Sequence, residues 1–163
     1  MRIKTGRLLL RNFEEKDLPQ MLDYLGDPDV MQYIEPPFQQ EQVRQFLQQC
    51  GLEQPPLIYA LEESCSGNLA GHVIFHPFEG RRCYELGWIL GKDFQGKGYA
   101  LEISRALLQY ASETLRLANV VLETLPENLP SLHLIQKLDA VPAGVKDGLL
   151  LFRISFPLNE THL

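Results

Sequence analysis

The stretch that decides the fold runs from Cys83 to Ala111 and reads C-Y-E-L-G-W-I-L-G-K-D-F-Q-G-K-G-Y-A-L-E-I-S-R-A-L-L-Q-Y-A. Its first part, Tyr84 to Leu90, is mostly aromatic or aliphatic, which is typical of a strand covered on both faces. A glycine-rich turn follows, and after it apolar residues recur at helical spacing. The stretch is therefore predicted to fold as a strand, a turn and an amphipathic helix. The apolar positions of that helix are Ile103, Leu107, Leu108, Ala111 and Leu115.

The turn has the features of a phosphate-binding site. Gly96 and Gly98 allow backbone conformations in which successive N–H groups point into one concavity. The first turn of a helix leaves further N–H groups unpaired and carries the positive end of the helix dipole. Such a turn holds phosphate without many charged side chains. The residues predicted to contribute are Gln95, Gly96, Lys97, Gly98, Tyr99 and Ala100.

Length and composition are those of a soluble globular protein. With 163 residues, we expect one domain spanning 1–163, and 45% hydrophobic and 22% charged residues are ordinary for this class. No apolar run approaches the roughly 20 residues needed to span a bilayer, and the N-terminus lacks a signal-peptide pattern. The three cysteines, Cys50, Cys65 and Cys83, are odd in number and scattered. This pattern predicts reduced thiols and a cytoplasmic location.

Charge narrows the range of partners. A net charge of −6 argues against nonspecific nucleic-acid binding, but it is compatible with an anionic ligand held by backbone amides. It mildly favours a cationic second ligand. The four histidines show no metal-ligand spacing, so no metal site is predicted. The sequence leaves open whether the protein is a monomer or a homodimer.

The rest of the chain alternates between helical and strand patterns. Helices are predicted at Glu14–Leu25, Asp29–Tyr33, Gln39–Cys50 and Ser131–Leu138. Gly51 is the expected C-cap of the third helix. Strands are predicted at Arg7–Arg11, Leu57–Leu61, Leu69–Phe75, Val120–Leu125 and twice within Ala140–Phe156. Turns are expected at His76–Gly80 and at Lys146-Asp147-Gly148. This order predicts a mixed sheet with helices on both faces.

Five motifs carry a resemblance to a known family. The turn Q-G-K-G-Y-A fits the signature Q/R-x-x-G-x-G/A of the GNAT superfamily of acetyl-CoA-dependent N-acetyltransferases. The opening T-G-R-L-L-L-R-N-F-E-E-K-D-L (Thr5–Leu18) resembles the branch that contains the ribosomal-protein N-terminal acetyltransferases RimJ and RimL. So do the segments D-P-D-V-M (Asp27–Met31), Y-E-L-G-W-I-L (Tyr84–Leu90) and E-N-L-P-S-L-H-L-I-Q-K-L (Glu127–Leu138).

The resemblance implies a fold, a co-substrate and a reaction. The fold would be an α/β (α+β mixed) one, with a mostly antiparallel twisted sheet of about six or seven strands. The reaction would be transfer of acetyl from acetyl-CoA to a primary amine by direct attack in a ternary complex. The amine could belong to a protein N-terminus or to a small molecule. The alternative, from another class, is a GNAT-fold module that binds acetyl-CoA and regulates a partner with little or no turnover.

The resemblance also implies where acetyl-CoA binds. The central strand of this family splays from its neighbour, so the backbone of Trp88, Ile89 and Leu90 would pair with the pantetheine arm. Asn128 and Ser131 match the family's Asn-x-x-Ser and would lie beside the pantetheine or the sulfur. The alternatives are that the glycine turn binds nothing, that Asn128 only orders its loop, and that Ser131 is only a helix N-cap.

Glu85 is the leading candidate for a general base. It shares one face of the predicted central strand with Gly87 and Ile89, in apolar surroundings, from which it can act through a water. The alternatives are a carboxylate paired with Arg81 or Arg82, or a group that orients the substrate. A base is needed less for an α-amino group, with a pKa near 7.7–8, than for a lysine amine with a pKa near 10.4.

Other ionisable residues are weaker candidates. Glu35 lies where this family often forms the acceptor wall, and it either binds a cationic substrate or faces solvent. His72 and His76 are titratable but read as an ordinary strand and turn histidine. Cys83 is not expected to carry acetyl covalently, because no histidine partner is evident and buried cysteines are commonly structural.

Two positions depart from the family pattern. Ile135 stands where many GNAT enzymes have a tyrosine that protonates the leaving thiolate, so Ser131 or a water would have to serve. Members of the RimJ/RimL branch commonly lack this tyrosine as well. Asp139-Ala140 stands in place of the usual Gly-Phe, and Asp139 is expected to adopt the left-handed cap conformation.

Overall fold

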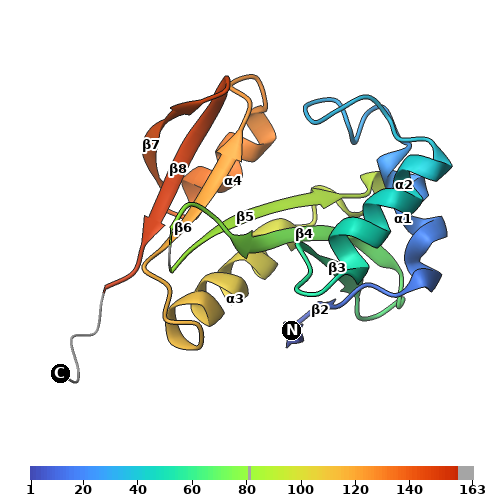
Figure 1. The fold of residues 1–163 in the computed structure, drawn as a ribbon, viewed down its shortest axis with the longest axis horizontal. Coiled ribbons are helices and arrows are strands. Elements are labelled where there is room, and N and C mark those ends of the chain that lie inside the picture. Colours follow the sequence, from blue (N-terminus) through green and yellow to red (C-terminus); the bar gives the residue numbers. More distant parts are fainter. Residues whose placement is uncertain (81, 158–163) are drawn as a thin grey trace.

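The computed structural model describes residues 1–80 and 82–157 (Figure 1). Eight strands form one sheet in the order β1-β2-β3-β4-β5-β6-β8-β7, and every neighbouring pair is antiparallel except β5 and β6. The strands are β1 (Ile3–Lys4), β2 (Leu8–Arg11), β3 (Ile58–Glu63), β4 (Leu69–Pro77), β5 (Cys83–Leu90), β6 (Asn119–Thr124), β7 (Val141–Lys146) and β8 (Leu149–Ser155).

The predicted mixed, mostly antiparallel sheet is confirmed, with eight strands in place of six or seven. The additional strand is β1, which pairs with β2 over Ile3 and Lys4 only. Two residues are too few for an alternating pattern to be visible in the sequence.

Helices cover both faces of the sheet, as predicted (Figure 1). One face packs against α1 and α2, and the other against α3 and α4. The helices are α1 (Leu18–Leu25), α2 (Gln40–Phe46), α3 (Tyr99–Glu113) and α4 (Leu129–Lys137). Short helices are η1 (Glu15–Asp17), the π-helical η2 (Leu47–Leu52) and η3 (Lys92–Phe94). Within the described ranges, no helix combines the length and apolar character needed to cross a membrane.

Strand β5 lies in the middle of this arrangement and is covered on both sides. Leu86 and Leu90 are buried in the cluster under α3 and α4, whereas Ile89 packs against the cluster under α1 and α2. Gly71 of β4 lies opposite Leu90, and a Cβ added at Gly71 would lie 2.0 Å from the carbonyl oxygen of Ile89. Only glycine therefore fits where β4 passes the end of β5.

Some local predictions were wrong, and each for a local reason. Residues Asp29–Tyr33 form a series of turns and no helix. Gly51 is not a C-cap, because the helix continues past it as η2 and the glycine packs against Phe13. The last helix begins at Leu129, two residues before Ser131, with a proline in its first turn.

Two turn predictions are confirmed. Asp139 follows α4 with φ 57°, the left-handed conformation that glycine usually provides at a helix end. Asp147 and Gly148, with φ of 52° and 81°, connect β7 to β8. Asp tolerates this conformation better than most residues, because its short polar side chain can form local hydrogen bonds.

His72 is fully buried on the α1/α2 face. Its Nδ1 lies 2.9 Å from the hydroxyl oxygen of Tyr24, and the rings of Phe13 and Phe46 pack around it. Nε2 has no hydrogen-bond partner among the described residues. Burial lowers the pKa of His72 from 6.5 to about 3, so the folded protein holds this imidazole neutral.

This burial predicts a pH-dependent stability. The unfolded chain takes up a proton at this position near pH 6.5 and the folded protein does not, so stability is lost as pH falls from 6.5 toward 3. At pH 5 the loss from this residue is about 2 kcal/mol. Urea unfolding at pH 7.5 and 5.0 measures it, with His72→Gln as the comparison. An equal loss of stability in the wild type and in His72→Gln would contradict the assignment.

Candidate active site

The sheet opens between β5 and β6. The two parallel strands share only three register pairs, Cys83–Asn119, Tyr84–Val120 and Glu85–Val121. Beyond these pairs β5 stays paired with β4 as far as Leu90, while β6 stays paired with β8. The edges of β5 and β6 that face each other are thus left without strand partners, and Figure 1 shows β6, β8 and β7 turning away from β5.

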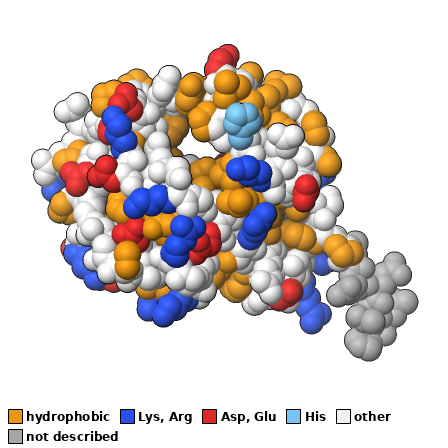
Figure 2. All heavy atoms as spheres, turned by 180° about the vertical axis from the view of Figure 1, so that it is seen from behind, with side chains coloured by type: hydrophobic (Ala, Val, Ile, Leu, Met, Phe, Trp, Pro, Cys, Tyr) orange, Lys and Arg blue, Asp and Glu red, His pale blue; other side chains and the backbone are white. Residues whose placement is uncertain are grey.

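The opening forms a cleft of about 690 Å³. Its walls come from β5, β6, the turn after β5, the start of α4 and the loop between α1 and α2. Figure 2 shows the molecule from behind, with a hollow bordered by hydrophobic side chains and with lysine or arginine side chains beside it. The predicted site residues that line the cleft are Glu85, Trp88, Ile89, Leu90, Gln95, Gly96, Gly98, Tyr99, Ala100, Asn128 and Ser131.

The glycine turn lies at the mouth of this cleft. Gly96 and Gly98 have φ of 73° and 79°, in the left-handed region that favours glycine. Gly98 precedes α3 without a side-chain cap, and the backbone N–H groups from Gly96 to Leu101 donate to no other described residue. Gln95 does not supply a free backbone donor as predicted, because its N–H donates to the Lys92 carbonyl at 3.3 Å, and its side chain donates from Nε2 to the Leu90 carbonyl at 3.0 Å. The turn thus presents unpaired N–H donors next to the cleft.

Lys97 is the predicted site residue that does not line the cleft. Its Nζ lies 3.5 Å from Oε1 of Glu63, which also accepts a short hydrogen bond from the Tyr99 hydroxyl. The ammonium lies over the rings of Phe94 and Tyr99, at 5.4 and 5.6 Å from their centroids. Only the backbone of Lys97 is therefore placed to act in the turn.

Asn128 and Ser131 have different roles at the start of α4. Asn128 is the N-cap, and its Oδ1 accepts from the backbone N–H of Ser131 at 3.2 Å. The alternative that Ser131 caps the helix is therefore wrong, because Ser131 lies in the first turn. The Ser131 hydroxyl makes no hydrogen bond within the described chain. Ile135, one turn further on, is buried and also lines the cleft.

Glu85 is paired with a histidine. Its Oε2 lies 3.1 Å from Nε2 of His76, and Nδ1 of that ring lies 2.9 Å from the carbonyl oxygen of Pro77. Two acceptors around one imidazole favour its doubly protonated form, and the hydrogen bond to Glu85 raises the pKa of His76 against the effect of burial. The two side chains face each other because β4 extends to Pro77, so His76 lies opposite Glu85 and outside the predicted turn.

A second carboxylate, Glu123, was not predicted from the sequence. It lies on β6 two residues beyond the last β5–β6 pair and lines the cleft. Burial raises its pKa, and the negative charge of Glu85 raises it further. Glu123 is the one charged residue of β6, but the sequence did not show that β6 borders an opening. Two carboxylates therefore flank the narrow end of the cleft.

The remaining candidates are placed less favourably. Glu35 is exposed and does not line the cleft, although its loop contributes Asp29, Tyr33 and Ile34. Cys83 is buried, and burial raises the pKa of its thiol, which disfavours the thiolate. No group of three or more metal-ligating residues in the described part of the chain could hold a metal ion.

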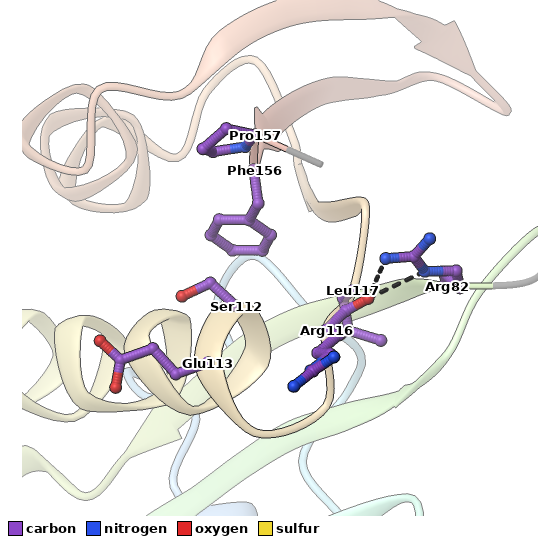
Figure 3. Close-up of a pocket in the computed structure, with 7 residues that line it drawn as sticks. All are labelled: Arg82, Ser112, Glu113, Arg116, Leu117, Phe156 and Pro157. Carbon is purple, nitrogen blue, oxygen red and sulfur yellow. Dashed lines mark hydrogen bonds between the residues drawn. The ribbon is translucent and has the colours of Figure 1, made fainter. Parts of the chain in front are cut away.

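A second hollow of about 440 Å³ lies between the end of α3 and the end of β8 (Figure 3). Arg82 donates from Nε and Nη2 to the carbonyl oxygen of Arg116, at 2.8 and 2.6 Å. Arg82 is therefore not the partner of Glu85, contrary to the alternative considered from the sequence, and Arg81 lies outside the described residues. The rest of the lining consists of Ser112, Glu113, Leu117, Phe156 and Pro157.

The family is decided by comparison with known proteins. The family model described as acetyltransferase (GNAT) domain matches residues 7–141, most of the chain. The chain belongs to the GNAT acetyltransferase family. It is thus an N-acetyltransferase by descent, and the splayed strands, the glycine turn and the cleft are parts of a GNAT domain.

Similar proteins support this assignment. The uncharacterized N-acetyltransferase YnaD of Bacillus subtilis (strain 168) is 36% identical over 142 residues, which cover 85% of this chain and 81% of that protein. The crystal structure of a GNAT-family acetyltransferase from Bacillus anthracis has a TM-score of 0.87 at 30% identity, covering 95% of this chain and 98% of that chain. Spermidine N-acetyltransferase from Vibrio cholerae, in complex with CoA and spermine, has a TM-score of 0.77 at 22% identity, covering 93% and 96%. The last likeness shows the fold alone.

The cleft of this GNAT domain fits coenzyme A. Unpaired N–H groups at the turn suit a pyrophosphate, and the unpaired edge of β5 suits the amide groups of pantetheine.

Gly98→Asp places a negative charge where the phosphates would lie, so we expect CoA affinity to fall at least tenfold, measured by calorimetry. Gly80→Asp is the control, because Gly80 has a similar φ of 89° and lies in the β4–β5 hairpin. Unchanged affinity in a folded Gly98→Asp protein would remove the turn from the site.

Proposed function

We propose that the protein transfers acetyl from acetyl-CoA to a primary amine by direct attack in a ternary complex. The observation that carries the proposal is the cleft between β5 and β6. Unpaired N–H donors border its mouth, and the carboxylates of Glu85 and Glu123 border its narrow end. An anionic donor and a cationic acceptor thus have complementary surroundings in one cavity.

Acetyl-CoA supplies the activated acetyl group as a thioester. In the proposal, the backbone of Gly96 to Leu101 binds its pyrophosphate, and the backbone of Trp88, Ile89 and Leu90 pairs with its pantetheine arm. The free edge of β5 and the capping contact between Asn128 and Ser131 support this path. The thioester would then lie toward Gly87, between the two strands.

The acceptor is proposed to enter from the α1/α2 side of the sheet. Glu85 alternates with Leu86 along β5, so it faces away from α3, and the loop between α1 and α2 lines this side of the cleft. The two carboxylates favour an amine that arrives protonated. Asp29 joins this loop to η3 through Lys92, at 2.7 Å between Oδ2 and Nζ.

Glu85 is proposed as the general base. Its Oε2 is held by His76, which leaves Oε1 to take the proton from the ammonium group of the acceptor directly or through a water. Removing that proton at pH 7 costs about 1 kcal/mol for an α-amino group and about 4–5 kcal/mol for a lysine. The neutral amine then forms the new C–N bond as the C–S bond breaks, and the second proton that the nitrogen loses passes through water to bulk solvent or to the leaving thiolate.

The leaving thiolate needs a proton donor other than the tyrosine that many GNAT enzymes use. Ile135 cannot donate a proton, whereas the Ser131 hydroxyl lines the cleft and makes no hydrogen bond to a described residue. A thiol with a pKa near 8.5 is also a tolerable leaving group without full protonation. We propose that Ser131 or a water protonates the sulfur.

The acceptor is tested by measuring CoA release against a panel of amines. The motifs that resemble the RimJ/RimL branch favour peptides with a free N-terminus, so these belong beside polyamines, amino acids and aminoglycosides. We expect acetyl-CoA-dependent release of CoA with at least one primary amine. Tight acetyl-CoA binding without turnover on any acceptor would favour the non-catalytic regulatory module. That alternative is motivated by Ile135, which stands in place of a proton-donating tyrosine.

Glu85→Gln tests the base. We expect kcat to fall roughly a hundredfold or more, because a positioned base contributes about 10²–10⁴ in rate, with little change in CoA affinity. The acidic limb of the pH–rate profile is expected to change as well. Glu123→Gln is the matched comparison, for which a several-fold rise in the acceptor KM is expected. An unaltered profile in Glu85→Gln would exclude this residue as the base.

A further inference from the structure

The segment before β2 makes contact with the first turn of α3, although the two are far apart in the sequence. The Thr5 hydroxyl donates to Oε1 of Glu102 at 2.6 Å, and the backbone N–H of Arg7 donates to the same oxygen at 2.9 Å. Nε of Arg7 donates to Oε2 of Glu102 at 2.7 Å. Both oxygens of Glu102 are thus held by one short segment of the chain.

The same arginine also holds the glycine turn. Nη1 of Arg7 donates to the backbone carbonyl of Lys97 at 2.8 Å, and the guanidinium lies over the Tyr99 ring, 4.7 Å from its centroid. A Cβ built on Gly98 would lie 3.5 Å from Nη2. One side chain therefore spans the turn from its middle residue to the helix that follows.

This contact fixes the direction of a backbone donor. The carbonyl of Lys97 and the N–H of Gly98 belong to one planar trans peptide unit, so they point in opposite directions. With the carbonyl held toward Arg7, the N–H of Gly98 points away from Arg7. Without this hydrogen bond, a turn with two glycines has many accessible backbone conformations.

The contact also balances charge near the proposed phosphate site. Burial opposes ionisation of Glu102, but the hydrogen bonds from Thr5 and Arg7 outweigh it and lower the pKa of this carboxyl. A carboxylate in the first turn of α3 repels a phosphate group bound there, and Arg7 places a positive charge beside it. The side chain of Lys97 points toward Glu63, so the positive charge beside Glu102 comes from Arg7.

We propose that Arg7 is a positioning residue for the phosphate-binding turn, and that it sets the affinity for the pyrophosphate end of acetyl-CoA without taking part in acetyl transfer. This inference rests on the proposed function. Loss of Arg7 should therefore weaken the binding of acetyl donors that carry the pyrophosphate and should not affect donors that lack it.

The test compares two acetyl donors in variants of Arg7. Acetyl-CoA carries the pyrophosphate, and S-acetylpantetheine lacks it. In Arg7→Met, which keeps an apolar stem over Tyr99, we expect the Kd of CoA and the KM of acetyl-CoA to rise about tenfold or more. We expect kcat at saturating acetyl-CoA, and kcat/KM for S-acetylpantetheine, to stay at the wild-type values.

Two further variants sharpen the test. Arg7→Lys keeps the stem and the charge, and a several-fold rise in Kd is expected because one ammonium does not reproduce the planar fork of donors. Arg44→Ala removes an exposed arginine from α2, on the other face of the sheet, and is expected to leave Kd unchanged. Thermal unfolding of each variant verifies that it is folded.

Two results would overturn the inference. Wild-type CoA affinity in Arg7→Met would show that the turn does not depend on Arg7. An equal loss of kcat/KM with both donors would show that Arg7 supports the fold of the whole site and not the phosphate end. Failure of the wild-type protein to bind CoA would instead overturn the proposed function, and the inference with it.

Discussion

The parting of β5 from β6 after Glu85 and Val121 is the constraint on which the rest of this structure depends. Unpaired backbone groups are costly when they are buried, so an opening in the middle of a sheet persists only where each strand is secured on its other side. Here β4 secures β5 to its last residue, and β8 secures β6. The opening is therefore built into the sheet, and it gives a ligand two strand edges to bind.

Other features of the site follow from this opening. The glycine turn begins where β5 ends, so its N–H groups lie at the mouth of the cleft, and Gly71 is needed because β4 runs so close to Ile89 there. Glu85 is the last β5 residue still paired with β6, and Glu123 lies just beyond the last pair on the other strand. The proposed donor and acceptor therefore meet where the two strands part.

Local patterns made part of this predictable. The strand, turn and helix of Cys83–Ala111 could be predicted because the spacing of apolar residues and the positions of glycines determine secondary structure locally. Contacts that depend on register or on distant segments were not. His76 was read as a turn residue because β4 continues two residues further than its apolar pattern. Glu123 could not be assigned without knowing that β6 borders an opening, and no local signal joins Arg7 to Glu102 across the chain.

A crystal structure with acetyl-CoA bound tests the central claim most directly. We predict pantetheine between β5 and β6, with its amides hydrogen-bonded to the backbone of Trp88–Leu90 and its pyrophosphate within hydrogen-bonding distance of the N–H groups of Gly96–Leu101. Acetyl-CoA bound elsewhere, for example in the hollow beside Arg82 and Arg116, with the β5–β6 cleft unchanged, would contradict the account.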